Sequence, residues 1–290
     1  MSEHEHGNAV IVLTQAAIAR SGHSIWSHGN FAIPTGTVTA IVGTNGAGKT
    51  TLMKAELGLL PLSEGSISVL GQPAGKATAQ IGYVPQSYTS EIDANLTVEQ
   101  SVLLGINGTR FGLHPTTRSE REQANQAMTF TGVHDRAHSR LSDLSGGLRQ
   151  RVAIAQALAG KPKLLMLDEP LANLDLASQR EIVQVLARLN SELGMSVQVV
   201  AHDLNMLLPI LDGAIYLLDG HPHYAGIHDV MDSELLTHLY GTDVEVVTTA
   251  QGEMFISPSV QGPSMRRHHT HTATEIARLD MEHSAQERQA

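Results

Sequence analysis

A glycine-rich segment ends in a lysine and two threonines, residue types that bind phosphates and metal ions. The segment is Gly43, Thr44, Asn45, Gly46, Ala47, Gly48, Lys49, Thr50 and Thr51, and its first eight residues fit the pattern G-x-x-x-x-G-K-[ST]. Glycines let backbone N–H groups turn inward around a polyphosphate, and a helix that follows points its positive end at it. We expect Lys49 to reach the β- and γ-phosphates of a nucleotide and the Thr50 hydroxyl to bind Mg²⁺. A chance glycine-rich turn is disfavoured, because the segment follows an apolar strand and opens a helix.

Two adjacent carboxylates, Asp168 and Glu169, follow the apolar run 164–167. A strand of a parallel sheet places its carboxyl end at the ligand crevice. Asp168 is therefore placed to hold Mg²⁺, and Glu169 to polarise an attacking water. Many strands end in acidic turns, so the two carboxylates alone do not identify a site. Together with the glycine-rich loop they indicate a nucleotide site.

A second candidate anion site begins at Ser145, Gly146 and Gly147, at the head of an apolar helix. Its exposed N–H groups and hydroxyl could bind a second phosphate. One nucleotide does not need two such sites from one chain, whereas a symmetric dimer could place each site against the partner's glycine-rich loop. The alternative is a simple helix cap by Ser145 with glycines as turn residues.

The surrounding pattern predicts the elements that must position these residues. Buried or half-buried strands are expected at 10–13, 38–42, 66–70, 81–84, 164–167, 196–201 and 214–218. Helices are expected at 52–59, 98–104, 119–130 and 147–159, and an amphipathic helix carries an apolar stripe of Ile182, Val185, Leu186 and Leu189. Strands that alternate with helices indicate a largely parallel, doubly wound core, interrupted by an inserted helical block at about 87–160.

Composition excludes several classes of protein. The 19 basic and 29 acidic side chains give a net charge of −10, which argues against nucleic acid as a partner. The chain has no cysteine, so it has neither disulfides nor a thiolate metal site. Its polar start is unlike a signal peptide, and its apolar runs, such as 163–167, are far shorter than the roughly 20 residues that cross a bilayer. If the protein acts at a membrane, we expect it to act at the membrane surface and not to span the bilayer.

The C-terminal segment 257–290 is poor in apolar residues, and we expect a flexible tail with at most a marginal helix at 274–281. His268, His269 and His271 could hold a divalent metal there. The simpler interpretation is a solvated polar tail.

Over residues 10–230 the chain closely resembles ATP-binding cassette (ABC) ATPases. Six motifs of that family stand in the expected order: the Walker A loop 43–50, the Q-loop Gln86, the signature 144–151, the Walker B strand 164–169, the D-loop 173–175 and the switch histidine His202. The resemblance implies that Gln86 senses Mg²⁺ and water and couples to membrane subunits. It also implies that Asp175 crosses a dimer interface and that His202 contacts the γ-phosphate, although a lone histidine would more often be an ordinary strand-end residue.

One position departs from the family pattern. An aromatic residue usually stacks on adenine well ahead of the Walker A loop, but the matching position here is Arg20. A guanidinium plane can stack on a base, so Arg20 is our candidate for adenine binding. Trp26 is the nearest large aromatic residue, but it stands where a core residue of the next strand is expected.

The resemblance implies an α/β fold: a P-loop NTPase, RecA-like core with a small antiparallel β subdomain and the inserted helical subdomain, all within residues 9–256. The segments 81–91, 101–113 and 235–256 resemble the zinc, manganese and iron uptake branch. That implies an ATP- and Mg²⁺-dependent homodimer at the cytoplasmic face of the cell membrane, with permease subunits and an extracytoplasmic metal-binding protein. The alternatives are an exporter ATPase, an importer ATPase for another cargo, a soluble cassette ATPase of DNA repair or translation, and a phosphate-loop kinase. The last offers no reason for the segment 144–151.

Overall fold

The structure is a computed structural model that describes residues 8–86, 95–108, 115–249 and 251–259. The predicted tail helix at 274–281 and the three histidines His268, His269 and His271 lie outside the described residues. Most of the described chain belongs to one compact unit that ends at Pro258.

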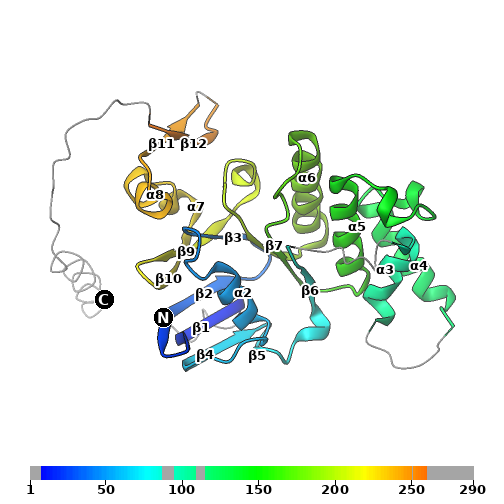
Figure 1. Cartoon of the computed structure of the whole chain (residues 1–290), viewed down its shortest axis with the longest axis horizontal. Coiled ribbons are helices and arrows are strands. Elements are labelled where there is room, and N and C mark those ends of the chain that lie inside the picture. The colour runs from blue at the N-terminus through cyan, green and yellow to red at the C-terminus, as the bar shows by residue number, and fades with distance from the viewer. Residues whose placement is uncertain (1–7, 87–94, 109–114, 250, 260–290) are drawn as a thin grey trace. The chain divides into compact units, whose positions relative to one another are not determined.

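A six-stranded sheet forms the centre of the chain (Figure 1). Its strands lie in the order β10 (His221–Gly226), β9 (Gly213–Leu218), β3 (Val38–Val42), β8 (Ser196–Val200), β7 (Leu164–Asp168) and β6 (Ile81–Val84). The five strands from β9 to β6 run parallel, and β10 is antiparallel to β9. This confirms the predicted parallel core; β10, whose His-Pro-His-Tyr sequence is not apolar, was not predicted.

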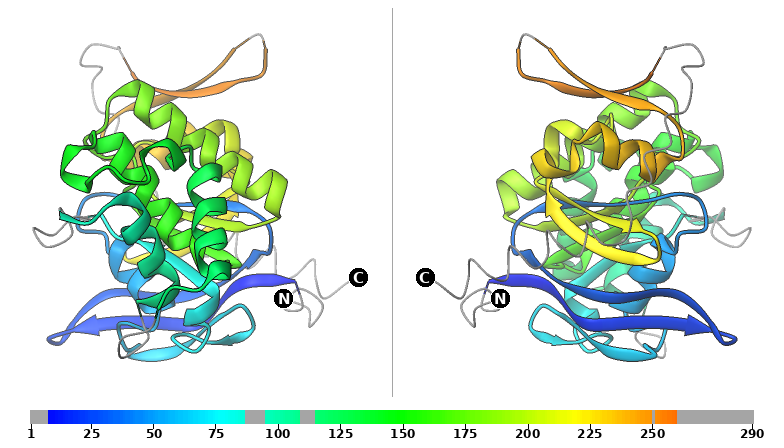
Figure 2. Two further views of the ribbon diagram at one scale, coloured as in Figure 1. Left: turned by 90° about the vertical axis from the view of Figure 1, so that its right-hand side faces the viewer. Right: turned by 90° about the vertical axis from the view of Figure 1, so that its left-hand side faces the viewer.

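An antiparallel sheet of β2 (His23–Pro34), β1 (Ala9–Arg20), β4 (Glu64–Val69) and β5 (Gln72–Pro73) forms the expected β subdomain. Its blue and cyan strands lie side by side in both views of Figure 2. The prediction of a short first strand at 10–13 was wrong, because β1 continues past an irregularity at Gln15, which has a φ of 46°. Gly65 lies against the Gln15 backbone there, so a side chain at Gly65 would have no room.

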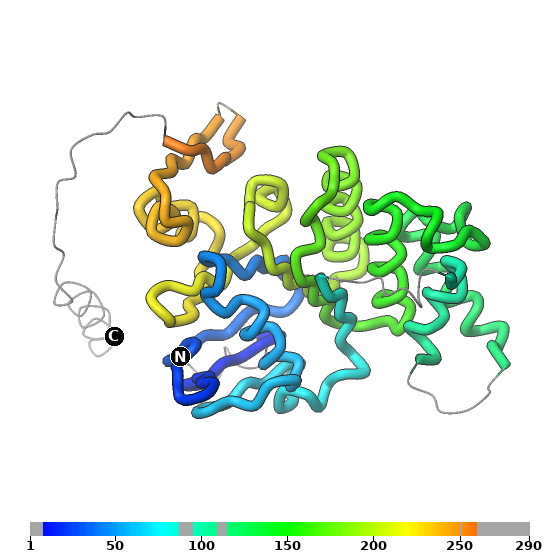
Figure 3. The backbone as a smooth tube through the Cα atoms, viewed as in Figure 1, coloured from blue at the N-terminus to red at the C-terminus, as the bar shows by residue number. Residues whose placement is uncertain are grey.

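Among the described residues between β6 and β7 stand three α-helices: α3 (Val98–Asn107), α4 (Arg118–Phe130) and α5 (Gly146–Ala159). In Figure 3 the green tubes of these helices lie together at one side of the chain. Thr97 and Thr117 each form a capping box at the start of α3 and α4. Gly105 of α3 touches the Gln156 backbone of α5, a distance that only glycine permits. The inserted helical subdomain is therefore tightly packed within itself.

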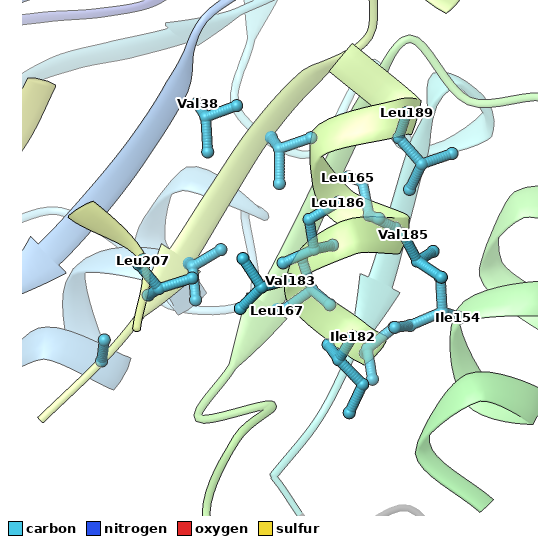
Figure 4. Close-up of a cluster of buried hydrophobic side chains, with 14 of the residues drawn as sticks. Val38, Ile154, Leu165, Leu167, Ile182, Val183, Val185, Leu186, Leu189 and Leu207 are labelled. Atoms are coloured by element: carbon cyan, nitrogen blue, oxygen red, sulfur yellow. The ribbon is translucent and has the colours of Figure 1, made fainter. Parts of the chain in front are cut away.

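Helices cover both faces of the central sheet. Helix α6 (Leu176–Leu193) buries Ile182, Val185, Leu186 and Leu189 against one face, as its periodicity predicted (Figure 4). Helix α2 (Lys49–Glu56) packs Leu52 and Met53 against the other face. Helix α2 begins at Lys49, three residues earlier than predicted, because the glycine-rich loop passes directly into its first turn.

One carboxyl group lies fully buried in this core. Glu56 is the last residue of α2, and its Oε1 accepts a hydrogen bond of 3.3 Å from Gln198 Nε2 on β8. Neither Glu56 Oε2 nor Gln198 Oε1 has a partner among the described residues. Burial raises the pKa of Glu56 from 4.5 to about 8, so the carboxyl is neutral at pH 7.

The chain continues past the central sheet into two short helices, α7 (Ile227–Val230) and α8 (Ser233–Tyr240), and a hairpin of β11 (Val244–Thr248) and β12 (Met254–Pro258). Strand β12 includes Ser257, the predicted first residue of the tail. Single turns of 3₁₀ helix lie at η1 (Thr78–Gln80), η3 (His134–Arg136), η4 (Leu141–Asp143) and η5 (Leu208–Ile210). Within the described ranges, no helix is both long and apolar enough to cross a bilayer.

Candidate functional site

Four neighbouring parallel strands deliver the candidate residues to one edge of the sheet. The glycine-rich loop follows β3, His202 follows β8, Glu169 follows β7 and Gln86 follows β6. Neighbouring strands lie about 4.8 Å apart, so side chains at their carboxyl ends come within reach of one another. Gly46 and Gly48 have φ values of 83° and 98°, a region that side chains disfavour.

The loop rests on the β subdomain. A Cβ at Gly48 would lie 2.8 Å from Ile25 Cγ2 and 3.2 Å from Trp26 Cδ1. Trp26 is fully buried in β2, the core position expected for it. The loop thus packs directly on β2 of the β subdomain, and only glycine fits at position 48.

Lys49 is buried at the first turn of α2, and its ammonium group donates to the Gly43 and Thr44 carbonyls at 2.8 and 3.0 Å. Burial lowers the pKa of Lys49, and the nearby charges of Glu169 and Asp168 act in the opposite direction. The Lys49 ammonium lies near two carboxylates and is surrounded by the loop backbone, an arrangement suited to bind a polyphosphate.

Thr50 and Asp168 bring two oxygen atoms together across 118 residues of sequence. The Thr50 hydroxyl donates to Asp168 Oδ1 at 3.1 Å, and Asp168 is buried. Burial raises the pKa of Asp168, while the Thr50 hydrogen bond lowers it. A hydroxyl and a carboxylate beside a phosphate site are the oxygen ligands that Mg²⁺ takes, with water and phosphate completing its shell. Thr50 and Asp168 are therefore suited to bind Mg²⁺.

Glu169 lies at the centre of a hydrogen-bonded group. Its Oε2 accepts from Gln86 Nε2 at 2.6 Å, and its Oε1 lies 2.5 Å from His202 Nε2. Glu169 has a φ of 52°, and its N–H donates to the Val200 carbonyl of β8 at 3.1 Å. The carboxylate is thus aimed by the backbone as well as by its partners. A cavity of about 220 Å³ lies beside Glu169 and His202.

The start of α5 packs against the start of α6. Ser145 caps α5 by accepting from the Leu148 N–H at 3.3 Å, as the simpler interpretation expected. A Cβ at Gly147 would lie 2.6 Å from Ser178 Cβ, so only glycine permits this contact. Asp175 caps α6, accepting at 2.9 Å from the Ser178 N–H and at 2.8 Å from its hydroxyl. These hydrogen bonds to Ser178 lower the pKa of Asp175.

The predicted adenine contact lies outside the group around Glu169, and two residues of the site were not predicted. Arg20 is exposed at the end of β1, paired across the hairpin with His23, and it is not part of the hydrogen-bonded group at Glu169. Sequence reasoning missed Ser178, which links the signature helix to Asp175. It also missed Asn205, which lies three residues beyond His202 and binds Ile256; no local pattern marked either residue.

A glycine-rich loop that joins a buried strand to a helix, with an acidic strand end beside it, defines a phosphate-loop nucleoside triphosphatase. The family model described as ABC transporter matches residues 27–172. The chain belongs to this family and is one of its ATPases.

Curated proteins and solved structures are similar to this chain over most of its length. A probable metal transport system ATP-binding protein of Chlamydia trachomatis is 33% identical over 242 residues, covering 83% of this chain and 93% of the relative. The manganese transport system ATP-binding protein of Bacillus subtilis is 37% identical over 209 residues, covering 72% and 83%. A metal-chelate type ABC transporter, solved in an inward-facing conformation, has a TM-score of 0.77 at 26% identity, covering 88% of this chain and 99% of that one.

Proposed function

We propose that this chain is the ATP-hydrolysing subunit of a transporter that imports a divalent metal ion of the zinc or manganese type. The observation that carries the ATPase part is the grouping of Lys49, Thr50, Asp168 and Glu169 at the carboxyl ends of neighbouring strands. The metal cargo is supported by the names of the relatives.

ATP binding is assigned to the loop from Gly43 to Thr51. Its backbone N–H groups and the N-terminus of α2 face the phosphates, and Lys49 exchanges its contacts with the Gly43 and Thr44 carbonyls for contacts with the β- and γ-phosphates. Thr50 and Asp168 would hold Mg²⁺, which supplies charge neutralisation of the phosphate oxygens. Arg20 is the proposed adenine contact.

Hydrolysis is assigned to Glu169 as the group that orients and deprotonates the attacking water. Gln86 and His202 each hold one carboxylate oxygen and thereby fix its direction. In the proposed closed state, His202 turns to the γ-phosphate, and Gln86 reports the occupied site to the membrane subunits.

The second anion site is assigned to a partner copy. Ser145, Gly146 and Gly147 pack beside the start of α6, which is part of their own chain and not of its phosphate loop. The first N–H groups of α5 have no partner within the helix. A head-to-tail homodimer would place them, with Asp175 nearby, on the γ-phosphate bound by the other chain.

Two bound ATP molecules would thus join two chains, and hydrolysis would separate them. The helical subdomain α3–α5 would move with each closure and transmit force to permease subunits in the membrane. We place the chain at the cytoplasmic face of the membrane as a peripheral subunit. An extracytoplasmic metal-binding protein would deliver the cargo.

Lys49→Ala in the full-length chain tests this proposal, because it removes the positive charge at the phosphates. We expect loss of ATP binding and hydrolysis with an unchanged melting temperature. A strain that carries the variant in place of the wild-type chain should lose uptake of radioactive zinc or manganese. Lys76→Ala, at an exposed lysine beyond β5, is the matched control.

The outcomes separate the parts of the proposal. ATPase activity near the wild-type level in Lys49→Ala would overturn the phosphate-loop assignment. Lost ATPase activity with unchanged uptake of both metals would overturn the cargo, and increased accumulation of either metal would show an exporter.

A further inference from the structure

The loop after β8 carries both His202 and the turn that follows it. Asn205 begins this turn, where its N–H donates to Asp203 Oδ1 at 2.9 Å. Leu204 and Leu207 are fully buried and anchor the loop to the core. His202 itself is held less firmly, because 48% of its side chain is exposed. The position of the His202 ring therefore depends on the loop backbone.

Asn205 is bound from outside the loop by the C-terminal hairpin. Its Nδ2 donates to the Ile256 carbonyl at 3.0 Å, and its Oδ1 accepts from the Ile256 N–H at 2.8 Å. Ile256 lies in β12, where it pairs with Val246 of β11. The Asn205 amide thus occupies the free edge of β12 as a further strand would.

Apolar packing also joins the hairpin to the core in which the loop's Leu204 and Leu207 are buried. Val246, Met254 and Ile256 pack on the core cluster that contains Leu204 and Leu207. Tyr240, the last residue of α8, lies near Asp203; burial and then the Asp203 charge raise its pKa to about 12. This C-terminal segment lies outside the residues that the family model matches, which end at 172.

We propose that the hairpin β11–β12 positions His202 for ATP turnover through Asn205, which is a positioning residue. The proposal rests on the proposed role of His202. Asn205 joins the loop to β12 by two hydrogen bonds only three residues from His202, whose ring contacts Glu169. Without this connection, Leu204 and Leu207 would stay buried, but the backbone next to His202 would no longer hold the exposed ring in one position.

The test compares Asn205→Ala with Asn205→Asp in the full-length chain. Alanine removes both hydrogen bonds, whereas aspartate keeps an acceptor for the Ile256 N–H. We expect kcat for MgATP to fall about tenfold in the alanine variant, the effect of losing hydrogen bonds of ordinary strength, and less in the aspartate variant. KM for ATP should change little, because the phosphate loop is untouched.

A double mutant distinguishes positioning from general stability. In a His202→Ala background, Asn205→Ala should cause no further loss of kcat, because the group that it positions is gone. An equal loss in both backgrounds, or an unchanged kcat in Asn205→Ala alone, would overturn the proposal. Wild-type turnover in His202→Ala alone would instead refute the proposed role of His202.

Two shortened chains provide an independent measurement. A chain that ends at Thr249 lacks β12, and we expect its kcat to fall as in Asn205→Ala. A chain that ends at Ser259 keeps β12 and should turn over like the wild type. Equal turnover of the two chains would contradict the assignment of β12.

Discussion

The buried carboxyl of Glu56 provides a quantitative test of the core. Glu56→Gln keeps the shape of the side chain and replaces the neutral acid by an amide. Gln198 Nε2 can still donate to the oxygen at position 56, and the new NH₂ group can donate to Gln198 Oε1, which has no partner among the described residues. We therefore expect the variant to fold and to be at least as stable as the wild type at neutral pH.

The size of the effect follows from proton linkage. The folded-state pKa of Glu56 is about 8, against an ordinary value of 4.5. Between these pH values the unfolded wild type has released a proton that the folded chain retains, so rising pH favours unfolding. The stability advantage of Glu56→Gln should grow by about 1.4 kcal/mol per pH unit, reaching on the order of 4–5 kcal/mol near pH 8. Above pH 8 both states release the proton and the difference becomes constant.

Urea unfolding of both proteins from pH 5 to pH 9 measures this difference, in which all other titrating groups cancel. Glu64→Gln removes an exposed carboxyl on β4 and is the matched control. It measures the effect of losing an exposed carboxyl, against which the difference for Glu56→Gln is compared. A flat difference for Glu56→Gln would refute our account of the buried acid, and so would a variant that is less stable at every pH.

Three further predictions concern the proposed motor. Glu169→Gln keeps shape but removes the basic carboxylate, so MgATP should still bind while hydrolysis falls roughly 10²- to 10⁴-fold; size-exclusion chromatography should show a persistent dimer, and lost binding would make Glu169 structural. Ser145→Arg should leave nucleotide binding to each monomer intact but block ATP-driven dimerisation in sedimentation experiments, and a loss of monomer binding would contradict this. Removal of residues 260–290 should leave the melting temperature and ATPase rate nearly unchanged, because their composition offers little to bury; a drop of several degrees would oppose it.

Most of the site could be predicted because its signals are local. A buried strand followed by glycines, or by Asp168 and Glu169, shows in a few consecutive residues. The parallel sheet then brings the strand ends together, so the grouping with His202 followed from the fold class.

The features that were missed depend on contacts distant in sequence. The polar residues at positions 14 and 15 look like the end of a strand, yet β1 continues because its partners β2 and β4 pair with both halves. The hairpin β11–β12 is joined to the loop after β8 through Asn205, which is 51 residues away from Ile256 in sequence. No window of sequence contains such a pairing.

The order of the strands has a consequence for protein engineering. Gln86, Glu169 and His202 meet because β6, β7 and β8 are neighbours in the sheet, whatever chain length separates them. The segment between β6 and β7 is thus a replaceable module, and a related ATPase could donate its own α3–α5 without disturbing the catalytic distances. The graft must retain glycine at position 147, where α5 meets Ser178. If α3–α5 transmits force to the permease subunits as proposed, such chimaeras would drive a different permease with unchanged catalytic residues.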